Sequence, residues 1–285
     1  MNESGDIAIT CKNCGHLFEG KYCNRCGEKV YSRHDKTMIH LFEESAHFIT
    51  HFDGSFFNTF RAICTSPGKL SVDYCYGVRK KYFKPISFFL LLVVLYLLFN
   101  LTEGLSQRLF YYPRNLLYGH YAIKKIQHVL ITTGMTMEEL SKVFHEKAEK
   151  VSKLLLLILI PASAAILQLF TFRKKRLFFD QVIFATEINI VVILFGFMLL
   201  PLIVYIIQFI VGFFVAKEFY LMDAAMSVFA LIMVVIYFFI ATRKFYKLNW
   251  LWSCLLTIGF FLLYGLFFQF IYKFILFLIS ISLVH

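Results

Sequence analysis

Residues 79–99 read RKKYFKPISFFLLLVVLYLLF, a basic and aromatic segment that runs directly into an apolar one. A transmembrane helix needs about 20 mostly apolar residues, and Lys and Arg collect on its cytoplasmic side. This stretch therefore predicts a helix that enters a membrane at Pro85 from its basic side. The whole chain agrees, because 59% of its 285 residues are hydrophobic and only 16% are charged, against about a quarter charged in soluble domains.

Further apolar runs predict a mainly α-helical, multi-pass transmembrane bundle of five spans. The third and fifth runs exceed about 20 residues, so these spans should tilt, kink or project beyond the bilayer. Pro161 and Pro201 are candidate kinks, and a division of the last run at Gly265 into two short spans stays open. The expected spans are residues 85–105, 152–172, 182–215, 221–241 and 250–281.

The Lys/Arg clusters define the sides of the membrane. If there are five spans, the three clusters fall on one face, which places the N-terminus in the cytoplasm and the C-terminus outside a bacterial inner membrane. The expected units are an N-terminal ribbon (1–32), a juxtamembrane helical segment (33–84) and a transmembrane domain (85–285) with an outer loop (106–150). The clusters are Arg79, Lys80, Lys81 and Lys84; Arg173, Lys174, Lys175 and Arg176; and Arg243, Lys244 and Lys247.

Four cysteines near the N-terminus form a metal-ligand pattern. Cys11 and Cys14 make one C-x2-C pair, and Cys23 and Cys26 make another after eight intervening residues. Four thiolates fill the tetrahedral coordination of Zn²⁺ and leave no position for water, so the pattern predicts a structural zinc ribbon. A redox dithiol or a metal-free segment are the alternatives. The charges of the ribbon are mixed, which favours a cytoplasmic protein partner and makes nucleic acid unlikely.

Residues 36–52 predict an amphipathic helix with a polar stripe. His40, Glu44, His47 and His51 share one face at helical spacing. The simplest interpretation is that this stripe is the solvent-facing side of a helix that lies in the membrane interface. A second metal site, a pH sensor and a catalytic face are the alternatives. A second short helix should follow, with Phe56, Phe57, Phe60 and Ile63 on one side.

Two polar residues fall inside the expected third span. A carboxylate such as Glu187 is costly in a membrane and is a functional hypothesis by default, and Asn189 lies beside it. The alternative is that Glu187 pairs with the Arg173–Arg176 cluster. In the outer loop, Thr136-Met-Glu138-Glu139 predicts a capping box at the start of a helix, and residues 106–135 are a candidate surface helix. No protease, nucleotide-binding or dinucleotide-binding motif is present.

One set of motifs resembles a bacterial family of uncharacterised membrane proteins, the domain of unknown function 3667. The motifs cover the first third of the chain, and the rest matches only as a generic multi-span region. The resemblance implies a zinc ribbon on an inner-membrane protein of unknown activity and carries over no catalytic residue. The motifs are Cys11-x2-Cys14-Gly15, Gly20-x-Tyr22-Cys23-x2-Cys26-Gly27, His51-Phe52-Asp53-Gly54 with Phe56 and Thr59, Pro67-Gly68, and Gly77-Val78-Arg79-Lys80-Lys81-Tyr82 before Lys84-Pro85.

These observations lead to one principal functional hypothesis. We expect a non-enzymatic docking or regulatory protein whose zinc ribbon meets a protein partner and whose Arg79, Lys80, Lys81 and Lys84 meet anionic lipid headgroups. A small-solute or ion permease that uses Glu187 and Asn189 is one alternative. An intramembrane enzyme that acts on lipids is the other.

Overall fold

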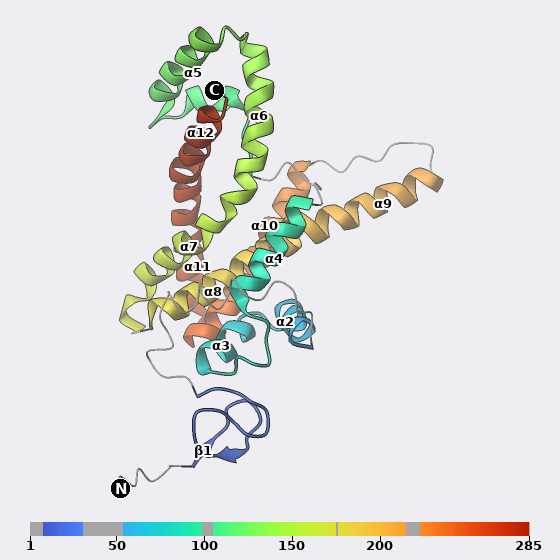
Figure 1. The fold of residues 1–285 in the computed structure, drawn as a ribbon, viewed down its shortest axis with the longest axis vertical. Coiled ribbons are helices and arrows are strands. Elements are labelled where there is room, and N and C mark those ends of the chain that lie inside the picture. Colours follow the sequence, from blue (N-terminus) through green and yellow to red (C-terminus); the bar gives the residue numbers. More distant parts are fainter. Residues whose placement is uncertain (1–7, 31–53, 99–104, 175, 215–222, 285) are drawn as a thin grey trace.

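The computed structural model describes residues 8–30, 54–98, 105–174, 176–214 and 223–284. It is a helical molecule with a small two-stranded hairpin near the N-terminus (Figure 1). The hairpin lies at one end of the molecule, and the C-terminus lies at the opposite end beside α5 and α6. The mainly helical, multi-span architecture expected from the sequence is confirmed.

The described part of the chain contains two short strands and a series of helices. They are β1 (Ile9–Thr10), β2 (Leu17–Phe18), α2 (Gly54–Thr65), α3 (Lys69–Tyr76), α4 (Pro85–Leu98), η2 (Leu109–Arg114), α5 (Gly119–Thr133), α6 (Met137–Leu154), α7 (Leu156–Thr171), η3 (Phe172–Lys174), α8 (Phe178–Val191), η4 (Val192–Leu199), α9 (Leu200–Phe214), α10 (Asp223–Tyr246), α11 (Trp250–Leu266), η5 (Phe267–Tyr272) and α12 (Lys273–Ser282).

Four helical segments in the described part of the chain are long and apolar enough to cross a membrane. They match the expected second to fifth spans, with ends shifted by a few residues. The expected first span begins at Pro85 as predicted, and its described helix α4 is an apolar helix of 14 residues. The four long segments are Leu156–Lys174, Phe178–Ile207, Ser227–Tyr246 and Trp250–Ser282.

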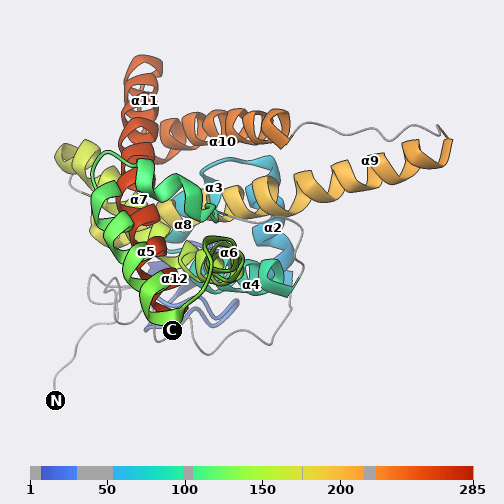
Figure 2. The ribbon, with the colours of Figure 1, turned by 90° about the horizontal axis from the view of Figure 1, so that it is seen from above.

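Helix α8 lies at the centre of the bundle (Figure 2). Every residue from Phe179 to Val191 is buried, because α3, α4, α7 and α10 all pack against it. Aromatic rings fill the contact with α10: Phe184 stacks on Phe245 with 4.6 Å between ring centroids and meets the edge of Tyr246. A helix that is buried on all sides carries its polar side chains into the interior, so each of them needs a partner there.

The two longest spans contain π-helical turns rather than loops. η4 lies immediately before Pro201, which lacks the N–H that a regular helix would use, so the irregularity lies next to one candidate kink. The last span continues through Gly265 and η5 without a break in the helix. Pro161 lies inside the continuous helix α7, and the chain breaks its helix at Leu155 instead.

The segment expected as a loop at 106–150 forms a helical cap at the end of the molecule where the C-terminus lies. Thr136 and Glu139 make the predicted capping box, in which each side chain bonds the backbone N–H of the other residue, and they start α6. Residues 119–133 form the helix α5. The expectation for α2 was wrong in part, because Phe57 is 69% exposed and Phe60 is also exposed, whereas Ile63 is buried. Thr59 is fully buried on this helix, and its hydroxyl donates to the Ser55 carbonyl at 2.9 Å.

Candidate functional site

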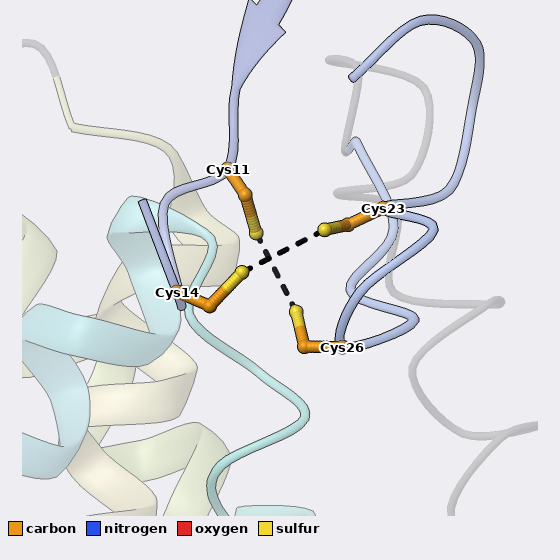
Figure 3. A group of neighbouring side chains, drawn as sticks. All are labelled: Cys11, Cys14, Cys23 and Cys26. Atoms are coloured by element: carbon orange, nitrogen blue, oxygen red, sulfur yellow. Dashed lines mark hydrogen bonds between the residues drawn. The ribbon is translucent and has the colours of Figure 1, made fainter. Parts of the chain in front are cut away.

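The four cysteines converge on one point in the ribbon (Figure 3). Their sulfur atoms all lie within 4.8 Å of one another. The Sγ atoms of Cys11 and Cys26 are 3.5 Å apart, and those of Cys14 and Cys23 are 3.7 Å apart. Four thiolates at a Zn–S distance of about 2.3 Å in a regular tetrahedron lie about 3.8 Å from each other, so the arrangement fits a metal ion of this size.

Two matching turns place the sulfurs. Gly15 N–H donates to the Cys11 carbonyl at 2.9 Å, and Gly27 N–H donates to the Cys23 carbonyl at 2.7 Å. Both glycines have positive φ, 73° and 70°, which an L side chain rarely adopts. The glycine behind each cysteine pair therefore lets the chain reverse around the metal position. The antiparallel strands β1 and β2 pair Ile9 with Phe18 and Thr10 with Leu17.

The ribbon is attached to the membrane bundle through the turn that follows α3. The Glu28 carboxylate is buried and accepts the backbone N–H groups of Arg79 and Lys80 at 3.2 and 2.9 Å. The Lys12 ammonium donates to the Tyr76 carbonyl at 2.8 Å, at the C-terminus of α3, where the helix dipole favours a cation. The cysteine cluster is thus held against the bundle by one anionic and one cationic side chain of its own ribbon.

The opposite end of α3 is held by Glu187 from the central helix. One carboxylate oxygen accepts Gly68 N–H at 2.8 Å and the Tyr237 hydroxyl at 2.8 Å. The other accepts Ser71 N–H at 2.8 Å and the Ser71 hydroxyl. Free N–H groups and the helix dipole make a helix N-terminus a binding site for an anion, and here a carboxylate from a transmembrane segment fills it.

The Pro67-Gly68 turn fits between helices because residue 68 has no side chain. Gly68 has φ of 76°, and a Cβ there would lie 2.8 Å from the backbone oxygen of Ala241 on α10. The contact brings the N-terminus of α3 against α10 at the same place where Glu187 reaches it. Helix α3 is therefore packed between α8 and α10. Glu187 accepts hydrogen bonds from the N–H groups at its N-terminus, and Lys12 donates to a carbonyl at its C-terminus.

Side chains of the same region connect α2 and α3 to the segment just before α4. The Thr59 hydroxyl accepts Phe83 N–H at 2.8 Å, and the Tyr82 hydroxyl donates to the Asp73 carboxylate at 2.6 Å. Burial together with this bond to Asp73 raises the pKa of Tyr82, so the phenol stays a neutral donor. Residues 54–85 thus form one folded junction between the ribbon and the spans.

The other polar residues of α8 bond neighbouring helices. Asn189 donates to the Ser163 hydroxyl on α7 at 3.2 Å and to its own helix at Ala185. Gln181 donates to Thr171 at 2.8 Å and accepts the Tyr246 hydroxyl. Glu187 and Asn189 lie on the same buried helix, but Glu187 bonds residues next to α3 and on α10, whereas Asn189 bonds Ser163 on α7. The alternative that Glu187 pairs with the arginine cluster is wrong, since its carboxylate is occupied by α3 and α10.

The predicted basic residues divide into buried and exposed ones. Arg79 is buried, with its guanidinium 5.0 Å from the ring centroids of both Tyr74 and Phe179, so its side chain does not face a lipid surface. Arg176 donates to the Phe245 carbonyl at the end of α10. Lys175 and the stripe of His40, Glu44, His47 and His51 lie outside the described residues. Lys80, Lys81, Arg173 and Lys174 are exposed, and Lys84 is partly exposed.

Sequence reasoning missed Lys12, Glu28, Ser71 and Tyr237. Glu28 follows directly on the Cys26-Gly27 turn, and Ser71 comes three residues after Gly68, the spacing of an N-terminal helix cap. Those two positions carried a local signal. Nothing local marks Tyr237, which meets Glu187 from 50 residues away in the chain.

The apolar helices and the cysteine cluster define the class of this protein. It is a multi-pass integral membrane protein with an N-terminal ribbon whose four cysteines could hold a metal ion. Residues 53–97, a stretch that covers most of the junction, match the family described as "Protein of unknown function (DUF3667)". The comparisons with curated proteins and with solved structures gave no match.

Proposed function

We propose that this protein is a docking or regulatory protein of the bacterial inner membrane, with a structural zinc ribbon on the cytoplasmic side. The observation that carries the proposal is the attachment of the ribbon through Glu28 and Lys12, which holds it in one orientation on the junction. The attached ribbon leaves Leu17 and Tyr22 62% and 60% exposed. Exposed apolar side chains on a small, fixed module are suited to a protein partner.

Anionic lipid is the second proposed partner. Lys80 and Lys81 are exposed and Lys84 is partly exposed, directly before α4 enters the bundle. Each cation near an anionic surface contributes roughly 1 kcal/mol. Because Arg79 is buried, we assign it to the junction and leave the lipid contact to the three lysines. Their attraction would hold the junction, and the ribbon on it, against the inner face of the membrane.

The alternatives have less support. A permease that uses Glu187 and Asn189 needs their polar groups to face a path, whereas both bond protein groups inside the bundle. The lipid-acting enzyme relies on the stripe of His40, Glu44, His47 and His51, which lies outside the described residues. We therefore prefer the docking role.

Photo-crosslinking in intact cells tests the partner. A benzoylphenylalanine residue introduced at Leu17 or Tyr22 should give a discrete crosslinked protein, and the same residue at Glu138, at the opposite end of the molecule, should not give that product. The product should disappear in the Cys11→Ser variant. Absence of a product from both ribbon positions would refute the protein-docking role.

Metal analysis of the purified full-length protein tests the zinc site. We expect one zinc ion per chain, lost in the Cys11→Ser variant and retained in a Cys64→Ser control, because Cys64 is exposed on α2 and far in sequence from the cluster. No metal in the wild type would refute the zinc ribbon. A second metal ion that survives Cys11→Ser would favour the alternative of another metal face.

A further inference from the structure

The cap at the C-terminal end of the molecule carries an apolar turn that the docking role does not use. Leu116 and Leu117, between η2 and α5, are 93% and 73% exposed. The Asn115 side chain accepts Leu117 N–H at 3.0 Å and orders the turn. Residues 105–135 contain no Asp or Glu and four cations, Arg108, Arg114, Lys124 and Lys125. Apolar side chains surrounded by cations are typical of a segment that lies in a membrane interface.

The last span shows where the far membrane interface lies. Trp250 and Trp252 are exposed at the start of α11, and Trp collects at membrane interfaces. Lys273 comes 23 residues later, which at 1.5 Å per residue is about 35 Å along the helix. That length crosses the roughly 30 Å hydrocarbon core with a modest tilt. The far interface is therefore expected near residues 269–273.

The boundary between α6 and α7 indicates the same position of the far membrane interface independently. The Tyr272 hydroxyl donates to the Ser152 carbonyl at 2.9 Å, which places Ser152 beside the same turn. At this point the chain changes from the charged helix α6 to the apolar helix α7. Farther out, the ion pair of Lys142 with Glu138 is largely exposed, as expected for a helix in water.

The apolar turn is attached to the last span at the expected position of the far membrane interface. The Tyr118 hydroxyl donates to the Gln269 carbonyl at 3.4 Å, and the Tyr118 ring lies 5.0 Å from the ring of Phe274. Tyr118 directly follows Leu117, so the two exposed leucines lie next to residues 269–274 and not far out in water. We propose that Leu116 and Leu117 insert into the outer leaflet, and that Arg114 and Lys124 contact the phosphates of its phospholipids. This proposal depends on the spans and does not depend on the docking role.

Fluorescence quenching in proteoliposomes tests the insertion. In a W250F/W252F background, L116W would report the turn, L157W on the exposed side of α7 would report the hydrocarbon core, and E138W would report the aqueous part of the cap. With brominated phosphatidylcholine in the vesicles, we expect at least a twofold loss of fluorescence for L116W and L157W and little change for E138W. Iodide in the buffer should quench E138W much more than L116W.

Two results would overturn the proposal. Quenching of L116W by iodide as strong as for E138W, with no effect of brominated lipid, would place the turn in water. Protection of L116W from both quenchers would mean that protein, such as a second copy of the chain, covers it. If L116W does not fold, L117W serves as the reporter, and folding of each variant is checked by a single symmetrical peak in size-exclusion chromatography and a wild-type helical circular dichroism spectrum.

Discussion

At the scale of single residues, Glu187 is a carboxylate that is costly to bury, but both of its oxygens accept hydrogen bonds. It is completely buried, and its two oxygens receive hydrogen bonds from Gly68, Ser71 and Tyr237. All of these groups donate, which suits an ionised carboxylate. A buried donor that loses its acceptor costs about 1–3 kcal/mol, so the carboxylate is expected to matter for stability far more than an ordinary polar contact between transmembrane helices.

We therefore predict that Glu187→Ala lowers the free energy of unfolding by about 3 kcal/mol or more, because two backbone N–H groups and two hydroxyls lose their acceptor. Glu187→Gln should show a smaller loss, since one acceptor oxygen remains while its NH₂ group faces donors. The measurement is unfolding by SDS in mixed micelles, followed by tryptophan fluorescence.

Two matched variants separate this effect from general sensitivity of the bundle. Ser163→Ala removes the hydroxyl that accepts from Asn189 and should cost only about 0.6 kcal/mol, the average for such contacts in membranes. Glu138→Gln changes an exposed carboxylate on α6 and should have little effect. If Glu187→Ala lowers the free energy of unfolding no more than Ser163→Ala does, Glu187 does not stabilise the N-terminus of α3 as proposed.

At the scale of elements, α3 connects the ribbon to the central helix. Glu187 holds its N-terminus, Lys12 holds its C-terminus, and Glu28 binds the turn that follows. Both charges match the helix dipole, with the anion at the N-terminus and the cation at the C-terminus. An eight-residue helix is marginal alone in water, so its order depends on these contacts and on packing between α8 and α10.

Glu28→Ala is predicted to detach the ribbon without releasing its metal. The Arg79 and Lys80 amides lose their acceptor, so their hydrogen exchange, followed by mass spectrometry on peptides covering residues 77–82, should become at least tenfold faster. The zinc content should stay at that of the wild type, because Glu28 is not a ligand. Glu19→Gln, an exposed carboxylate of the same ribbon, is the control and should leave exchange unchanged.

Unchanged exchange in Glu28→Ala would show that the junction is rigid without the ribbon. Loss of zinc in the same variant would show instead that Glu28 supports the fold of the ribbon, and would contradict the separation of roles. Lys12→Ala provides a second test, since it removes the contact to Tyr76 and leaves the Glu28 contacts in place.

The sequence predicted those elements whose signals are local. The cysteine cluster follows from spacing, the capping box of Thr136 and Glu139 from four consecutive residues, and the spans from long apolar runs. The partners of Glu187 were not predictable in this way, because Gly68 lies 119 residues away in the chain. Arg79 was expected at a lipid surface because of its basic neighbours, but tertiary packing buries it against Tyr74 and Phe179.

At the scale of the whole molecule, the ends of the chain lie on opposite sides of the bundle. The ribbon lies at one end, and α5, α6 and the C-terminus lie at the other (Figure 1). Helix α4 begins next to the junction and has 14 residues, about 21 Å at 1.5 Å per residue, against roughly 30 Å for the hydrocarbon core. We nevertheless predict that the expected first span, residues 85–105, makes a fifth crossing.

This arrangement predicts the orientation of both termini. Green fluorescent protein should be bright when fused to the N-terminus and dark at the C-terminus, because it does not fold after export in the unfolded state. Alkaline phosphatase should be active only at the C-terminus, because it needs the oxidising side to form its disulfides. The physical reason is that the exposed cations Arg173, Lys174, Arg243 and Lys244 resist translocation and keep their ends of α7 and α10 inside. Bright fluorescence from both fusions would mean that the chain crosses an even number of times and that α4 is not a span.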